Sequence, residues 1–341
     1  MGTTSTTSGS LTMHLGDIQI TPLAAESMGT RSLCTEIVTP DIRILLDPSA
    51  ALAKRYNLEP HPVEYLALKK SLDAIKSSAK KADALSISHY HFDHVRPGFV
   101  NHLYNLSTQD DRREMFENKL VFAKDNRETI NPSQRRRGFY FEKDVKDIVT
   151  RIEWSDNRVF EFGNTRVTFS HPLPHGPADT RLGYVIATII DYSEKRFLFA
   201  PDVQGPLDRN TLQYILSLDP ELAIVGGPPV YLSRFLKSEK ERALASLVSL
   251  ASTIPTLVID HHLLRDSNWQ KYFDPLIKAS ERAGNCILTL AELAGLDNHT
   301  YEANREDLYQ LEPPSKEFMN WTLSEEEYKV NHPPPLSGLD E

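Results

Sequence analysis

Residues 84–97 read ALSISHYHFDHVRP, and this stretch decides how the rest of the chain is interpreted. Its first half is apolar and β-like, which predicts a buried strand that ends at Ser88. Three histidines and an aspartate follow at once: His89, His91, Asp93 and His94. In an extended segment, residues two apart project to the same side, so His89 and His91 can converge on one metal ion. Asp93 and His94, where the chain turns, can face a second ion.

The chemistry of this motif favours an open metal site. Imidazole and carboxylate groups suit Zn²⁺, and also Fe or Mn in the divalent state. A closed structural zinc site needs four ligands for its ion, whereas this motif offers two for each ion. Cys34 and Cys286 are the only cysteines and lie far apart, so a thiolate zinc finger or a disulfide framework is not indicated. The motif therefore requires further ligands from other segments.

Three other predicted strands lead into residues of the required type. The strand TRVTFS (165–170) is followed by His171 and His175, KRFLFA (195–200) by Asp202, and TLVID (256–260) by His261 and His262. Side chains that leave the carboxyl ends of strands commonly carry the function of layered α/β proteins. Seven of the twelve histidines occur at the four strand ends, which a purely structural role does not anticipate. We expect one metal site built from all four.

The composition predicts a globular protein with one large domain. Among the 341 residues, 40% are hydrophobic and the net charge is −9. We expect a disordered leader at 1–14, a domain at 15–296 with a helical or loop insertion at about 97–150, and a C-terminal extension at 297–341 that wraps the domain. The first residues lack the layout of a signal peptide, and no window reaches about 18 consecutive apolar residues. These features predict a cytoplasmic protein without a membrane partner.

The acidic charge balance also bears on partners. It argues against nucleic acid as the substrate and favours a small molecule, although a local basic patch remains compatible with it. Such a patch occurs at Arg135, Arg136 and Arg137, beside three aromatic residues. Arg31 is a second candidate for binding an anionic substrate. The sequence does not fix the oligomeric state, and a homo-oligomer is compatible with it.

The strand, the HxHxDH motif, and the later His, Asp and His at strand ends together resemble the metallo-β-lactamase superfamily. The resemblance spans about residues 18–290. The segments LAAESMGTRSLCTEI (23–37), FAPDVQGP (199–206) and DHHLLRD (260–266) further resemble an uncharacterised archaeal branch of it, which supplies no reaction. The resemblance implies an α/β fold, an αββα four-layer sandwich with the metals at one edge of its two sheets.

By the same resemblance, the site holds two divalent ions, zinc first, with Fe or Mn as alternatives. The implied ligands are His89, His91 and a third histidine for the first ion, Asp93, His94 and a final histidine for the second, and Asp202 as the bridge between them.

Two of these ligands have competitors in the sequence. We prefer His175 to His171 as the third histidine, because Gly176 next to it allows a close backbone turn. We prefer His261 to His262, because His261 with Arg265 four residues later resembles the THxSxR motif of tRNA-processing ribonucleases in the superfamily. His171 and His262 stay open as alternatives.

The pattern predicts a metal-dependent hydrolase that uses a two-metal-activated water to cleave a small ester, lactone or phosphoester, with broad substrate tolerance. Asp93 can also orient the nucleophile. Tyr231, after the turn at residues 226–229, and Tyr90, inside the motif, can present hydroxyls to a developing oxyanion. Two alternatives share the fold: a phosphodiesterase or nuclease, and a mononuclear-iron oxygenase that acts on a persulfide.

Overall fold

The computed structural model describes residues 12–336 of the chain. Residues 1–11 of the predicted leader therefore lie outside the described residues. Its last two residues, Met13 and His14, belong to strand β1 (Met13–Leu15), which pairs antiparallel with β2 (Ile18–Pro22). Within the described range, no helix has the length and apolar character needed to cross a membrane.

The first sheet has seven strands arranged in the order of the sequence. After β1 and β2 come β3 (Thr35–Val38), β4 (Arg43–Leu46), β5 (Ala84–Ile87), β6 (Leu120–Ala123) and β7 (Arg151–Trp154). Strands β1 to β4 pair antiparallel, and β4 to β7 pair parallel. Strand β5 is apolar and buried throughout, as expected for a strand inside a sheet covered on both faces.

The second sheet also has seven strands, in the order β16-β15-β14-β13-β12-β9-β8. They are β8 (Val159–Phe162), β9 (Thr165–Phe169), β12 (Thr188–Tyr192), β13 (Lys195–Ala200), β14 (Leu222–Gly226), β15 (Thr256–Asp260) and β16 (Cys286–Leu288). Strands β13 to β16 pair parallel, and the remaining pairs are antiparallel. The short strands β10 (Leu173–Pro174) and β11 (Tyr184–Val185) form a separate antiparallel pair.

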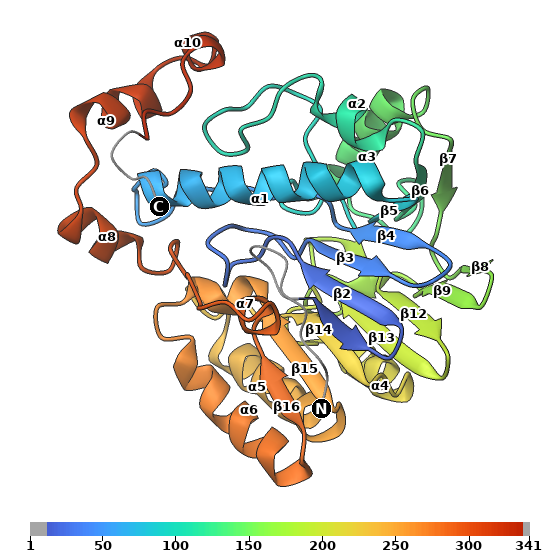
Figure 1. Cartoon of the computed structure of the whole chain (residues 1–341). Coiled ribbons are helices and arrows are strands. Elements are labelled where there is room, and N and C mark those ends of the chain that lie inside the picture. The colour runs from blue at the N-terminus through green and yellow to red at the C-terminus, as the bar shows by residue number, and fades with distance from the viewer. Residues whose placement is uncertain (1–11, 337–341) are drawn as a thin grey trace.

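Helices cover the outer face of each sheet (Figure 1). The helices over the first sheet are α1 (Pro62–Lys81), α2 (Asp111–Phe116) and α3 (Pro132–Val145). Those over the second are α4 (Arg209–Ser217), α5 (Lys237–Thr253) and α6 (Gln270–Ala283). Buried residues recur at helical spacing along α1, for example Leu68, Leu72 and Ile75, and the helix begins with Pro62 in its first turn, where the missing N–H costs nothing.

Three apolar layers hold this arrangement together. One lies between the two sheets and includes Phe122, Phe169 and Phe199. The second lies between the first sheet and α1 to α3, and the third between the second sheet and α4 to α6, where Leu247 of α5 is buried. Burying both faces of both sheets produces the αββα four-layer sandwich, which confirms the predicted fold class.

The segment at 97–150 is more closely integrated than an insertion. It supplies α2 and α3, as the expected helical element, but also β6, which pairs with β5 on one side and β7 on the other. The apolar run KLVFA (119–123) in this charged segment is typical of a strand, and β6 occupies it. The segment thus completes the first sheet and places α3 beside the carboxyl end of β5.

The C-terminal segment contains α7 (Leu290–Leu293), α8 (Arg305–Leu311), α9 (Lys316–Leu323) and α10 (Glu326–Asn331). Helix α7 packs against the second sheet, and the residues after it contact the N-terminal end of α1. Tyr65 of α1 meets the rings of Phe318 and Trp321 at centroid distances of 5.5 and 5.4 Å. The guanidinium of Arg305 donates to both carboxylate oxygens of Glu64 in α1, and both side chains are fully buried.

Candidate metal centre

Four strand ends meet at one edge of the sandwich. His89, Asp202 and His261 come after β5, β13 and β15, and His175 directly follows the short strand β10, which comes after β9. The Asp202 carboxylate lies at the centre of the group. Its Oδ2 atom is 2.8 Å from Nε2 of His175 and 3.1 Å from Nε2 of His89, and its Oδ1 atom is 2.9 Å from Nε2 of His261. The predicted convergence of distant strand ends is therefore present.

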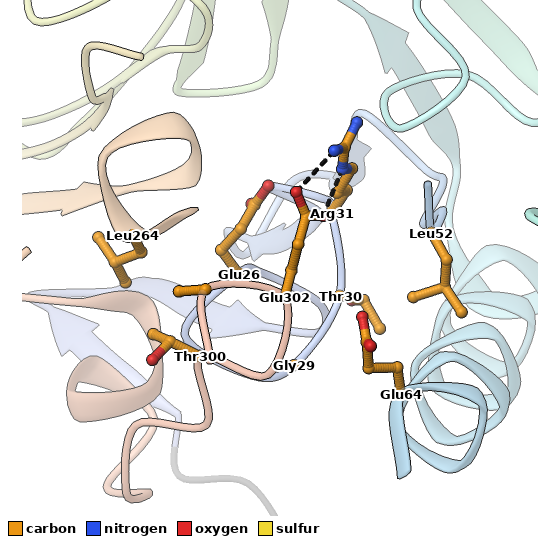
Figure 2. Close-up of a pocket in the computed structure, with 10 residues that line it drawn as sticks. Glu26, Gly29, Thr30, Arg31, Leu52, Glu64, Leu264, Thr300 and Glu302 are labelled. Carbon is orange, nitrogen blue, oxygen red and sulfur yellow. Dashed lines mark hydrogen bonds and ion pairs between the residues drawn. The ribbon is translucent and has the colours of Figure 1, made fainter. Parts of the chain in front are cut away.

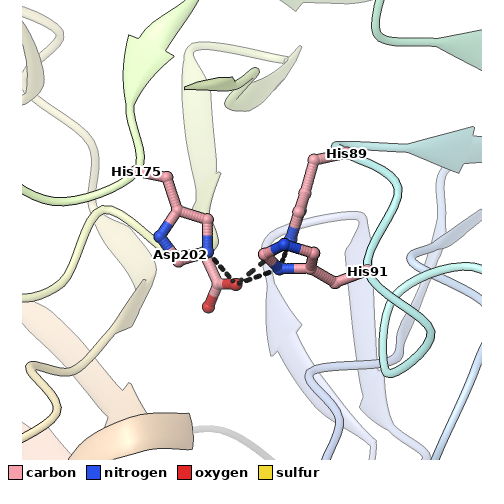
Figure 3. Close-up of side chains that lie close together, drawn as sticks. All are labelled: His89, His91, His175 and Asp202. Carbon is pink, nitrogen blue, oxygen red and sulfur yellow. Dashed lines mark hydrogen bonds and ion pairs between the residues drawn. The ribbon is translucent and has the colours of Figure 1, made fainter. Parts of the chain in front are cut away.

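A first group of ligand atoms consists of His89, His91, His175 and Asp202, all within 4.8 Å of one another (Figure 3). The Nε2 atom of His89 lies 3.0 Å from Nδ1 of His91. His91 presents Nδ1 to the centre, whereas His89 and His175 present Nε2. The side chains of His89, His175 and Asp202 are buried, and His91 is open to solvent on one side.

A second group consists of Asp93, His94 and His261, with ligand atoms again within 4.8 Å. The Nε2 atoms of His94 and His261 are 3.2 Å apart, and Oδ2 of Asp93 lies 3.8 Å from Nε2 of His261. Asp202 touches both groups, because its Oδ2 atom is also 3.4 Å from Nε2 of His94. Its two oxygens are thus placed to serve both groups.

The atoms in this cluster suit divalent metal ions. Within residues 12–336, the buried Nε2 of His175 and Oδ1 of Asp202 have no hydrogen-bond partner, although other polar atoms lie close by. Buried polar atoms without a partner are costly, so their presence together indicates that a ligand satisfies them. Imidazole nitrogens gathered around carboxylate oxygens are the donor set that Zn²⁺, Fe and Mn accept. The residues present therefore fit the metals that the motif implied.

For three of the inward-facing histidines, the ring nitrogen that points away from the centre has a polar partner. Nδ1 of His94 lies 2.8 Å from Oδ2 of Asp47, and Nδ1 of His261 lies 2.8 Å from Oε2 of Glu26. Nδ1 of His89 lies 3.0 Å from the hydroxyl of Ser88. Such partners set the tautomer and the ring orientation of metal-binding histidines. They leave Nε2 directed to the centre.

The sequence reasoning missed Glu26 and Asp47. Asp47 directly follows the apolar strand β4, so the strand-end criterion could have found it. Its two carboxylate oxygens also accept hydrogen bonds from the backbone N–H and the hydroxyl of Ser88, at 2.8 and 2.6 Å. Glu26 follows no strand and has no local signal that distinguishes it from other acidic residues.

The histidine alternatives occupy different environments. His171 is exposed, and its ring packs against Tyr214 at a centroid distance of 4.8 Å, away from the cluster. His261 is fully buried, with its backbone in the left-handed region at φ 70°. His262 lies beside it, with Nε2 3.4 Å from Oδ1 of Asp202. The structure thus brings His175 and His261 into the cluster and leaves His171 outside it. His262 also lies within reach, because its ligand atom is within 4.8 Å of those of Asp202 and His261.

The two tyrosine candidates also differ in their position relative to the cluster. Tyr90 is fully buried and donates its hydroxyl to the backbone oxygen of Lys124, so it does not face the cluster. Tyr231 lines the pocket that opens beside the histidines. Of the basic triplet, Arg137 packs its guanidinium over Phe92 at 4.6 Å, and Arg135 and Arg136 are exposed on α3. None of the three lines this pocket.

The ionisation of the cluster follows from its own charges. Burial disfavours the charged form of Asp202, yet the surrounding histidines, His261 first, hold its pKa well below the ordinary value. Burial and the neighbouring histidines lower the pKa of His89 well below its ordinary value. For His261, the carboxylates of Glu26 and Asp202 overcome burial and raise the pKa to about 9. Metal binding at His261 would therefore compete with a proton.

Helix α3 links the first motif to the loop that carries His175. Gln134 is fully buried; its amide donates to the backbone oxygen of Leu182 at 2.7 Å and accepts from the backbone N–H of Tyr90 at 3.5 Å. The backbone N–H of His175 donates to the oxygen of Gly183 at 2.9 Å, which closes the loop at its base. Gln134 therefore connects two segments that supply ligand atoms.

An open pocket of about 550 Å³ adjoins the cluster. Its lining includes His91, His175 and His262 together with Tyr56 and Tyr231. Pockets of roughly 300–1,000 Å³ suit small-molecule ligands. A substrate in this pocket would lie against the histidines of the first group.

The αββα sandwich, the HxHxDH motif after β5 and the ligand-type residues after β10, β13 and β15 form the arrangement that the resemblance to the metallo-β-lactamase superfamily implied. By sequence, the chain belongs to the UPF0282 family. It is 39% identical over 294 residues to the UPF0282 protein of Methanopyrus kandleri, an alignment that covers 85% of this chain and 99% of that relative. For the UPF0282 protein of Methanocaldococcus jannaschii the identity is 38%, with 86% and 97% covered.

No protein-family model matches the chain. Among solved structures, a variant of the CmlA β-hydroxylase is similar with a TM-score of 0.46 and 12% identity, covering 81% of this chain and 53% of that chain. A diphosphatase of the PhnP family gives a TM-score of 0.41 and 9% identity, covering 72% and 85%. At this level of similarity, neither structure bears on the reaction of this chain.

Proposed function

We propose that this protein is a metal-dependent hydrolase that cleaves a small ester, lactone or phosphoester. The observation that carries the proposal is the position of Asp202, whose two carboxylate oxygens face two separate groups of imidazole nitrogens beside an open pocket. Under this proposal the ligands divide as follows: His89, His91 and His175 for one ion, Asp93, His94 and His261 for the other, and Asp202 for both.

Two divalent ions in these positions would supply a water of lowered pKa and a Lewis acid for the oxygen under attack. The residues of the chain supply the rest. Asp93 is the carboxylate of the cluster that reaches solvent. Arg265 holds it, with the Nη2 atom of Arg265 3.3 Å from Oδ2 of Asp93. Asp93 can therefore orient the attacking water. Tyr231 and His262, both on the pocket wall, can donate hydrogen bonds to charge that develops on the substrate.

Metal content and turnover together test this function. We expect two ions per chain by elemental analysis after loading with Zn²⁺ or Mn²⁺. We expect hydrolysis of at least one member of a panel of lactones, carboxyl esters and phosphoesters, abolished by a chelator and restored by metal. Turnover that survives complete removal of metal would contradict the proposal. One iron per chain with oxygen-dependent consumption of a persulfide would replace it with the oxygenase alternative.

A further inference from the structure

The pocket beside the cluster is basic, although the chain as a whole has a net charge of −9. Five cationic side chains line it, and its lining contains no aspartate or glutamate. They are Arg31, Lys54, Arg55, Arg234 and Arg265. A pocket of one charge sign concentrates ligands of the opposite sign.

Three of these cations are already paired. Arg31 donates two hydrogen bonds of 2.6 Å to the carboxylate of Glu302, which Figure 2 shows. Lys54 lies 2.9 Å from Oε1 of Glu59. Arg265 is paired with Glu26 and Asp93. These three side chains shape the wall but have little unpaired charge to offer a ligand.

Arg55 and Arg234 differ from the other three. The nearest carboxylate oxygen to Arg55 is on Glu302, at 3.9 Å, which is too far for a hydrogen bond, and Glu302 is already engaged by Arg31. Arg234 is exposed and has no ion pair with any residue between 12 and 336. Two positive charges at the pocket therefore lack a close counter-charge.

The guanidinium of Arg55 is held in place by two tyrosine rings. Its central carbon lies 4.1 Å from the ring centroid of Tyr231 and 4.5 Å from that of Tyr56. The side chain is only 11% exposed, and its buried Nε has no hydrogen-bond partner among the described residues. One N–H of the guanidinium donates to the hydroxyl of Tyr56 at 3.0 Å. Stacking on the two rings fixes the plane of the guanidinium, and its other N–H groups make no hydrogen bond to a carboxylate, so they can serve an anion. Arg55 therefore has the geometry of an anion-binding residue rather than of a mobile surface charge.

The backbone around Arg55 supports the same conclusion. Arg55 and Leu58 exchange backbone hydrogen bonds of 3.1 and 2.8 Å across a two-residue turn. Both residues of the turn are left-handed, Tyr56 at φ 54° and Asn57 at φ 58°. A bulky aromatic residue rarely adopts this conformation, and such strain is concentrated at binding and active sites. Here the turn places Tyr56 beside the guanidinium at the pocket.

We propose that the pocket binds the phosphate group of a small phosphorylated substrate, with Arg55 and Arg234 as its anion-binding residues. This inference rests on the hydrolase proposed above and narrows its substrate class. The phosphate pairs with the two guanidinium groups that have no hydrogen-bonded carboxylate, because Arg donates to phosphate oxygens through several N–H groups in one plane. The bond to be cleaved then lies toward His91, His175 and His262 on the same pocket wall. A neutral ester or lactone would leave both guanidinium groups without a hydrogen-bonded anion.

AMP and adenosine form a matched pair of probes, because they differ by one phosphate group. We expect calorimetry on the zinc-loaded protein to show AMP binding at least tenfold more tightly than adenosine. Arg55→Ala and Arg234→Ala should each weaken AMP binding by about tenfold to a hundredfold and leave adenosine unchanged. Arg282→Ala, on the exposed face of α6, is the matched control and should change neither. Arg234→Glu, at an exposed position where folding is not at risk, should weaken AMP binding further.

The outcomes separate this inference from the proposed function. Equal affinities of AMP for the wild type, Arg55→Ala and Arg234→Glu would overturn the inference. Metal-dependent hydrolysis of neutral lactones that AMP does not inhibit would also overturn it, while the hydrolase would stand. Arginine-dependent binding of AMP in a protein that hydrolyses nothing would keep the inference and remove the hydrolase. Inorganic phosphate, titrated alone, should compete with AMP in the wild type and lose this ability in Arg55→Ala.

Discussion

The Nδ1 atom of His261 lies 2.8 Å from the Oε2 atom of Glu26, across 235 positions of the sequence. The other carboxylate oxygen of Glu26 accepts a hydrogen bond of 2.5 Å from Nε of Arg265. One buried carboxylate therefore orients His261 and also anchors the arginine that holds Asp93. The arrangement of Asp93 and His261 in the second group therefore depends on a residue outside that group.

Glu26→Gln should weaken metal binding at the second group. The amide lacks the charge that favours the Nδ1–H tautomer of His261 and leaves Arg265 without a carboxylate, so we expect affinity for one of two ions to fall by about tenfold to a hundredfold. Competition with a chromophoric chelator measures this affinity. Glu281→Gln, at an exposed position on α6, is the control. Unchanged affinity for both ions in the folded variant would contradict the role assigned to Glu26.

His175→Ala and His171→Ala form a matched pair for the first group. His175 is buried with Nε2 at the Asp202 carboxylate, whereas His171 is exposed beside Tyr214. We expect the zinc content of His175→Ala to fall from two ions to one and its turnover to fall by at least about a hundredfold, because a metal-site ligand is lost. His171→Ala should keep both ions and full turnover. The reverse pattern would move the third histidine to position 171.

His261→Ala and His262→Ala test the remaining choice in the same way. His261 is fully buried between Glu26 and Asp202, so its loss should remove one ion. His262 borders the pocket, and its alanine variant should retain both ions and lose turnover, because a hydrogen-bond donor to the substrate is removed. Elemental analysis of the two purified variants distinguishes them. Loss of an ion only from His262→Ala would exchange their roles.

The strand ends of the site could be predicted because their signals are local. A run of apolar residues that stops at a histidine or aspartate marks a strand and its exit, and β5, β9, β13 and β15 all begin and end within a residue or so of the predicted positions. Parallel packing of β13 to β15 then brings the exits of β13 and β15 to one edge. The meeting of the candidate ligands at one edge could therefore be predicted from the strand ends alone.

The residues that hold the site from outside the cluster could not be predicted from local signals. Glu26, Asp47 and Glu302 meet their partners across 47 to 271 positions, so their contacts arise only when the two sheets and the C-terminal segment pack. Arg55 illustrates the same limit, because its sequence neighbourhood gives no sign that the ring of Tyr231 lies against it. Acidic and basic residues are common on any protein surface. Only burial in the folded chain distinguishes the four residues named here from ordinary surface charges.

Gln134→Ala should loosen the loop that follows His175. Removal of the amide leaves the backbone oxygen of Leu182 without its donor, a loss of about 1 kcal/mol for a part-buried hydrogen bond. We expect faster hydrogen exchange at residues 176–183 and weaker binding of one metal ion, with exchange in the second sheet unchanged. Gln213→Ala, exposed on α4, is the control. Unchanged exchange at residues 176–183 would show that α3 does not hold this loop.

Glu302 should make stability depend on pH in the acidic range. Burial alone would raise its pKa, but Arg31 above all, with Arg265 and Arg305, lowers the pKa from 4.5 to about 2. The folded chain therefore favours the carboxylate more than the unfolded chain does. This contribution, about 3 kcal/mol, is fully present above about pH 5 and is lost as the pH falls from 5 toward 2.

The measurement compares Glu302→Gln with the wild type by chemical denaturation between pH 7 and pH 3. The free energy of unfolding should be lower for the variant at pH 7, and the difference should shrink as the pH approaches 3, because the wild-type carboxylate loses its advantage there. Subtraction of the two curves isolates Glu302 from the metal-site carboxylates. Glu306→Gln, exposed on α8, should follow the wild type throughout. A difference that stays constant from pH 7 to pH 3 would show that Glu302 stabilises the chain by packing and not by its charge.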